Sequence, residues 1–194
     1  TYNKAFNFVH NDLHSNNVMY AKTDKKWLYY HYNGKHYKVP TFGKIYKIID
    51  FGRATYSFKK EKICSDSFHP AGDAATQYNF EPYYNKDKPV LRPNPSFDLC
   101  RLACSLYDHF ADDDDPISDL IMSWCEDDKK RNIMYKKNGM ERYPDFKLYK
   151  MIARTVTSHT PEAQMGFFSK FVCSRKKIPK KKKIFNIDTL PCYA

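Results

Sequence analysis

The spacing of apolar residues changes near residue 95 of this 194-residue chain. Before it, apolar and aromatic residues form short runs separated by polar and turn residues, a pattern typical of strands. After it, they recur every three or four residues, as along one face of a helix, at Leu99, Leu102, Ala103, Leu106 and Phe110. We therefore predict an α+β domain, mainly helical, in which short strands come first and helices follow.

The strand region contains one strong hairpin signal. Aromatic-rich runs over 26–32 and 35–39 flank Asn33-Gly34, the dipeptide that best suits a two-residue hairpin turn. Shorter strands are predicted at 6–10 and 18–20, enclosing a polar loop, and at 44–49, running directly into Asp50. The polar loop and Asp50 are thus each expected next to a strand.

The remainder of the chain divides into an irregular part and a helical part. Residues 53–95 carry repeated prolines and no periodic pattern, so we predict a long connection of the kind that is either functional or disordered. Ser96 is a candidate N-cap for the first helix. Further helices are predicted over 117–125, 145–156 and 161–171.

Oxygen-bearing side chains in the polar loop and after strand 44–49 suit phosphoryl transfer. That reaction needs Mg²⁺ on the nucleotide phosphates, an oriented hydroxyl nucleophile and compensation of developing charge. Mg²⁺ typically takes one or two carboxylates together with phosphates and water. Asp50, with Gly52 allowing a turn, suits such a ligand, and the amide of Asn17 suits a second. Asp12 suits a base that accepts or orients the proton of the hydroxyl.

Two motifs carry a family resemblance. The stretch His10–Asn17, H-x-D-L-x-x-x-N, resembles the catalytic loop of eukaryotic-type protein kinases, and Asp50–Gly52, D-F-G, resembles their magnesium loop. The resemblance implies a kinase-like C-terminal lobe that uses ATP and Mg²⁺. It implies Asp12 as the catalytic base, and Asn17 and Asp50 as the residues that bind Mg²⁺ and, through it, the nucleotide.

The same resemblance assigns supporting residues. His10 and Phe51 would stack in the hydrophobic interior next to Gly52, and Asp98, opening the long helix, would anchor the backbone of the catalytic loop. Taken alone, Asp98 also fits an ordinary carboxylate at a helix start. His14 stands where Ser/Thr kinases carry a lysine that contacts the γ-phosphate, so it joins Asp12 as a candidate catalytic residue.

Several departures from the kinase pattern leave the acceptor open. Asn11 replaces the arginine that pairs with a phosphorylated activation loop, and no Ala-Pro-Glu ends that segment. His14 also resembles the small-molecule kinases that act on aminoglycosides and choline. The catalytic loop lacks the arginine of tyrosine kinases, which favours a Ser/Thr hydroxyl of a protein substrate. The alternatives are a small-molecule kinase and a pseudokinase or binding scaffold.

The resemblance divides the chain into a lobe over 1–172 and a basic tail over 173–194. The lobe contains a catalytic loop (10–17), an inserted hairpin (26–39), a magnesium loop (50–52), an activation segment (about 53–95) and a helical part (96–172). Kinases also grip ATP with a glycine-rich loop, a strand lysine and a helix glutamate, for which this sequence offers no counterpart. We therefore expect a fragment that lacks the N-terminal lobe and is inactive or very weak alone. The composition is similar to that of kinase-like proteins of large DNA viruses.

Charge and cysteine usage bear on partners and compartment. The net charge is +11, and residues 174–183 hold seven basic side chains. This tail is expected either to contact nucleic acid or an acidic partner, with nuclear targeting included, or to be solvated and disordered. The six cysteines show no C-x-x-C pair, which favours free thiols in an intracellular, cytoplasmic protein. No apolar run is long enough to span a membrane.

Overall fold

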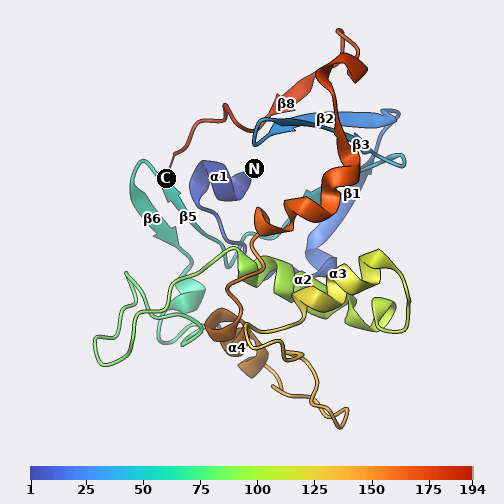
Figure 1. Cartoon of the computed structure of the whole chain (residues 1–194). Coiled ribbons are helices and arrows are strands. Elements are labelled where there is room, and N and C mark those ends of the chain that lie inside the picture. Colours follow the sequence, from blue (N-terminus) through green and yellow to red (C-terminus); the bar gives the residue numbers. More distant parts are fainter. Residues whose placement is uncertain (194) are drawn as a thin grey trace.

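The structure, a computed structural model that describes residues 1–193, combines a helical layer with small sheets (Figure 1). The helices are α1 (Tyr2–Phe6), α2 (Ser96–Phe110), α3 (Pro116–Trp124) and α4 (Lys147–Thr155). The expected α+β class is confirmed, but "mainly helical" is wrong, because helices of all kinds take 29% of the chain and strands 22%. Part of the reason is local, because residues 125–146 contain turns and isolated bridges. The helix predicted over 161–171 forms as a 3-10 helix, Ala163–Phe171.

The first sheet brings the two chemical motifs together. Strand β1 (Val18–Lys22) pairs antiparallel with β4 (Lys44–Ile48), and Val18 lies opposite Ile48. The backbone N–H of Ile49 donates to the carbonyl of Asn17, at 3.0 Å. The strands predicted at 18–20 and 44–49 are confirmed, and their pairing places the end of the catalytic loop beside Asp50.

The inserted hairpin forms as predicted. Strand β2 (Trp27–Tyr32) pairs with β3 (Lys35–Pro40), and Asn33 and Gly34 turn the chain at φ values of 49° and 69°. Both residues tolerate this left-handed region, which explains the strength of the signal. The hairpin is the centre of a four-stranded sheet of order β7-β3-β2-β8.

The outer strands of this sheet come from the C-terminal segment. They are β7 (Val172–Cys173) and β8 (Ile184–Asn186), and the expected boundary between lobe and tail falls within β7. The carboxylate of Asp188 then accepts N–H bonds from Asn33 and Gly34, at 2.7 and 3.0 Å. Residues 172–188 therefore fold back on the hairpin, in contrast to the expectation of a solvated tail.

The segment 53–95 is more regular than its sequence suggests. Strand β5 (Thr55–Phe58) pairs with β6 (Glu61–Cys64), and the turn consists of Lys59 and Lys60 at φ values of 51° and 68°. Lysine is an unusual occupant of this conformation, so no local signal marked the hairpin. Farther along, the side-chain amide of Asn79 donates to three carbonyls of its loop, those of Asn85, Lys88 and Pro89.

The start of the chain also differs from the prediction. Residues 2–6 form the short helix α1 rather than leading into a strand, and Val9 makes only an isolated bridge to Thr55. Helix α2 begins at Ser96 as expected, yet the N-cap position is Pro95. The Ser96 hydroxyl is buried and makes no hydrogen bond within residues 1–193. The capping role predicted for Ser96 is therefore wrong.

The core lies between α2, α3 and α4, the layer at the lower side of Figure 1. Phe97, Cys100 and Ala103 of α2 are fully buried, as are Ile152 of α4 and Val156 directly after it. All six cysteines are free thiols. Among the described residues, no helix is both long enough and apolar enough to cross a bilayer. This layer supports the catalytic loop from below.

Candidate active site

The catalytic loop rests on the first turn of α2. The Asp98 carboxylate accepts a hydrogen bond from the backbone N–H of His10 and another from that of Asn11, both at 2.9 Å. Asp98 is 7% exposed. Burial raises the pKa of Asp98 to about 6, although the two N–H donors and the nearby His10 oppose this shift. The structure thus brings Asp98 and the loop into the direct contact that the resemblance implied.

His10 and Phe51 are neighbours with different environments. The His10 ring is 1% exposed, its Nε2 lies 2.9 Å from the carbonyl oxygen of Ile49, and its centroid is 5.6 Å from that of Phe51. Phe51 also packs edge-on against Phe8, yet it remains 48% exposed. The two rings therefore meet, but only His10 lies in the interior.

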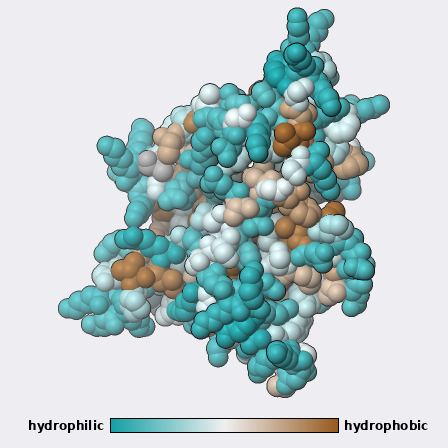
Figure 2. Space-filling model, viewed as in Figure 1, coloured by the Kyte–Doolittle hydropathy of each residue, from teal (hydrophilic) through white to brown (hydrophobic). Residues whose placement is uncertain are grey.

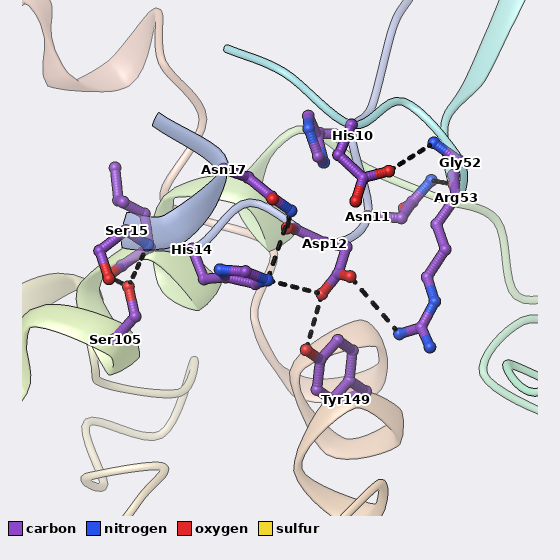
Figure 3. A network of polar contacts seen from close by, with 12 residues as sticks. His10, Asn11, Asp12, His14, Ser15, Asn17, Gly52, Arg53, Ser105 and Tyr149 are labelled. Carbon is purple, nitrogen blue, oxygen red and sulfur yellow. Dashed lines mark hydrogen bonds and ion pairs between the residues drawn. The ribbon is translucent and has the colours of Figure 1, made fainter. Parts of the chain in front are cut away.

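Asp12 is held by side chains from α4, from the turn after Gly52 and from its own loop (Figure 3). The Tyr149 hydroxyl, from α4, donates to Asp12 Oδ1 at 2.7 Å. The guanidinium of Arg53 lies 3.8 Å from Oδ2, and His14 Nε2 lies 3.9 Å from Oδ1. Burial, followed by the bond to Asp12, raises the pKa of Tyr149, so this phenol stays protonated and donates at neutral pH.

Asn17 and Asp50 keep oxygen atoms free for a ligand. The Asn17 amide nitrogen donates to the carbonyl of Asp12 at 3.0 Å and lies 3.3 Å from His14 Nε2, while its Oδ1 accepts no hydrogen bond within residues 1–193. Asp50 is exposed, and its Oδ1 accepts only a 3.3 Å bond from the N–H of Gly52. A Cβ at Gly52 would approach that same oxygen to 3.2 Å, so a side chain there would require the Asp50 carboxylate to shift by a few tenths of an ångström.

These oxygen atoms fit Mg²⁺ in a nucleotide complex. In the described part of the chain, no group of three or more His, Cys, Asp or Glu side chains is placed to hold a metal. Mg²⁺ does not need such a cage, because it binds through one or two protein ligands and completes its shell with phosphates and water. One carboxylate and one amide oxygen, both free, match this requirement.

Asn11 joins the catalytic loop to the segment after the magnesium loop. It is fully buried, and its amide nitrogen donates to the carbonyls of Val9 and Arg53 and to the Thr55 hydroxyl. Its Oδ1 accepts from the Tyr78 hydroxyl at 2.7 Å. Asn11 therefore makes this connection with a neutral amide.

Removing the Asn11 amide is expected to destabilise the protein. The variant Asn11→Ala leaves the fully buried Tyr78 hydroxyl without its acceptor, and an unpaired buried polar group costs about 1–3 kcal/mol. Urea denaturation should show a loss of this size. The double variant Asn11→Ala/Tyr78→Phe should lose less than the two single losses combined. Additive losses would show that the two side chains are not coupled.

Asp98 gives the stability a specific dependence on pH. Its pKa is raised from 3.8 to about 6 on folding, so its contribution to stability is present below about pH 4 and is lost as the pH rises to about 6. The loss is roughly 3 kcal/mol. We expect wild type to lose this stability relative to Asp98→Asn between pH 4 and pH 6, as measured by urea denaturation at each pH. A constant difference between the two proteins would contradict the shift.

Sequence reasoning did not identify Arg53 and Tyr149 as site residues. Arg53 directly follows the magnesium loop and also forms a 2.6 Å ion pair with Asp73, so its position next to Gly52 was a usable signal. Tyr149 lies 137 residues from Asp12 and carries no motif. Only the packing of α4 against α2 brings its hydroxyl to the site.

Comparisons with known proteins give little further guidance. No family model matches the chain. A 52-residue stretch is 38% identical to the "Uncharacterized protein ZK177.2" of Caenorhabditis elegans. It covers 27% of this chain and 18% of that protein. A likeness of this extent does not place the chain in a family.

Proposed function

We propose that the chain carries the catalytic part of an ATP-dependent phosphotransferase, related to the Ser/Thr protein kinases. The observation that carries the proposal is the meeting of three groups at one place. Asp12 lies in a loop fixed by Asp98, and Asn17 at the end of that loop lies beside the strand that leads to Asp50. This proximity of two short motifs supports the assignment of a base and of metal ligands to one reaction centre.

Each of these residues has a defined task in the proposed reaction. Asn17 Oδ1 and the Asp50 carboxylate would hold Mg²⁺, which when bound would supply positive charge against the ATP phosphates. Asp12 accepts the proton of the attacking hydroxyl and orients it toward the phosphate. Arg53, whose guanidinium lies 3.8 Å from Asp12 Oδ2, holds the carboxylate in place by charge.

His14 bears on the choice of acceptor. It lies between Asp12 and Asn17, at 3.9 Å from the carboxylate and 3.3 Å from the amide nitrogen, so it borders the position of the transferred group. A protein Ser/Thr hydroxyl is our first choice, and a small-molecule hydroxyl of the aminoglycoside or choline kind is the alternative. With all six cysteines as free thiols, we assign this activity to the cell interior, in the cytoplasm or nucleus.

A transfer assay distinguishes these functions. The protein at its natural length would be incubated with Mg²⁺ and ATP labelled on the γ-phosphate, together with basic and acidic protein substrates, choline and an aminoglycoside. We expect label on protein Ser/Thr residues and none with Asp50→Asn. If label appeared on choline or the aminoglycoside alone, the protein would be a small-molecule kinase and not a protein kinase. If Asp50→Asn transferred phosphate as well as wild type, the assignment of Asp50 as a metal ligand would be wrong. Absence of transfer with wild type would favour the binding scaffold.

A further inference from the structure

A cleft lined by lysines lies between the inserted hairpin and the C-terminal segment. Its volume is about 700 Å³, and it is bordered by Lys22 at the end of β1, by Lys25 and Lys26 from the β1–β2 connection and by Lys182 from the segment before β8. Trp27 and Tyr29 of β2 complete its apolar wall. We call this surface the basic face: Lys22, Lys25, Lys26, Trp27, Lys38 and Lys182.

The positive charge of the basic face is not neutralised within the protein. In residues 1–193, none of its lysines lies within ion-pair distance of a carboxylate, and Asp24 is the sole acidic residue among those lining the cleft. The adjoining stretch 175–183 adds further lysines and no acid. In the space-filling view, hydrophilic residues cover the tip that this stretch forms (Figure 2). Like charges gathered this closely favour a polyanionic partner.

The lysines are held in place by folded backbone. The stretch between β7 and β8 is tied to the hairpin at both ends, through the pairs His36–Cys173 and Tyr29–Ile184. Ile178 in its middle is 2% exposed, and its carbonyl accepts from the Arg175 guanidinium at 3.1 Å. The basic face is therefore a fixed surface, and binding needs little ordering of the chain.

An exposed aromatic ring stands among these lysines. Trp27 is 40% exposed, and the Lys38 ammonium lies 4.1 Å from its ring centroid. Lys38 comes from β3, where it lies opposite Tyr29, so it shares the face of the sheet that carries Trp27 and Tyr29. An exposed ring beside cations suits unpaired bases, which stack on aromatic rings while lysines contact the phosphates. An acidic peptide of Glu and Asp would use the charges but brings no planar group to stack on the indole.

We propose that the basic face binds single-stranded nucleic acid, with Trp27 as a stacking platform and Lys25, Lys26 and Lys182 on the phosphates. This surface is separate from the candidate active site. Lys22 stands at the far end of β1 from Asn17, about 16 Å away along the strand. The proposal does not depend on phosphotransfer, so the two can fail independently.

Fluorescence anisotropy with a labelled 20-nucleotide oligo(dT) tests the proposal on the whole chain. We expect wild type to bind, and the variant Lys25→Ala/Lys26→Ala/Lys182→Ala to bind at least about tenfold more weakly. With three fewer phosphate contacts, the slope of log affinity against log salt should shrink by about 2. Trp27→Ala should bind oligo(dT) about tenfold more weakly, because it removes stacking. The slope of log affinity against log salt should stay unchanged, because no charge is removed.

A matched variant controls for net charge. Lys129→Ala/Lys136→Ala/Lys137→Ala removes three exposed lysines from the region between α3 and α4 and should bind like wild type. Circular dichroism would establish that each variant is folded. If both triple variants lost the same affinity for the oligonucleotide, binding would depend on net charge alone, and the proposal would be overturned. It would also be overturned if Trp27→Ala bound like wild type, or if poly-glutamate or phosphatidylserine vesicles bound more tightly than the oligonucleotide.

Discussion

Replacing Asp12 with asparagine is expected to lower kcat for phosphotransfer by a factor of about 10²–10⁴, the usual contribution of a general base. The amide oxygen can still accept from Tyr149, so the loop should keep its conformation while the proton acceptor is lost. KM for ATP should change little, because Asn17 and Asp50 remain. The measurement is steady-state transfer of the γ-phosphate at saturating Mg²⁺.

The control for this variant is Asp112→Asn, which removes a carboxylate from the exposed loop before α3. It should keep wild-type kcat. If Asp12→Asn keeps more than half of the wild-type kcat, Asp12 is not the base. If kcat is retained but the stability falls, the bonds of Asp12 to Tyr149 and Arg53 are structural only.

Replacing Asp98 with alanine is expected to give the largest loss of stability among single changes at the site. It leaves the backbone N–H groups of His10 and Asn11 buried without an acceptor, each at about 1–3 kcal/mol, so the free energy of unfolding should fall by roughly 2–6 kcal/mol. The free energy of unfolding of Asp98→Asn should fall less at pH 7, because the asparagine amide oxygen can accept one of the two hydrogen bonds. Urea denaturation at pH 7 gives both values.

Asp119→Ala is the matched control, since this carboxylate also lies in the first turn of a helix but is exposed. Its effect should stay within about 0.5 kcal/mol, as for ordinary surface substitutions. If the loss in Asp98→Ala is no larger than this, then Asp98 is only a favourable charge at a helix start, and the loop has another support.

Local signals explain which elements could be predicted. The hairpin at Asn33-Gly34 and helix α2 formed within one or two residues of their predicted bounds, because turn chemistry and a helical period act over short distances. The hairpin β5–β6 was not predicted, because its turn consists of two lysines, which are not typical turn residues. The return of residues 172–188 to the sheet depends on pairing with strands whose partner residues lie 135 to 155 positions earlier in the chain, which no local pattern encodes.

The residues of the candidate site also fall into two groups, those that a local motif indicates and those that only tertiary packing brings to the site. Asp12, Asn17 and Asp50 could be identified because a short motif fixes residue types at fixed spacing, and the pairing of β1 with β4 then brings the motifs together. Tyr149 could not, because its contact with Asp12 exists only after α4 packs. The sequence showed that Asn11 lacks the charge of an arginine, and the structure shows its four hydrogen-bond partners instead.

The central claim is that Asn17 and Asp50 together bind the metal that carries the nucleotide. Titration calorimetry of the natural-length protein with ATP, at saturating and at zero Mg²⁺, tests it most directly. We predict Mg²⁺-dependent binding in wild type and a loss of at least about tenfold in Asn17→Ala and in Asp50→Asn, since even indirect support of a metal site is worth 10–100-fold. Equal ATP affinity in all three proteins, or affinity that does not depend on Mg²⁺, would contradict the account.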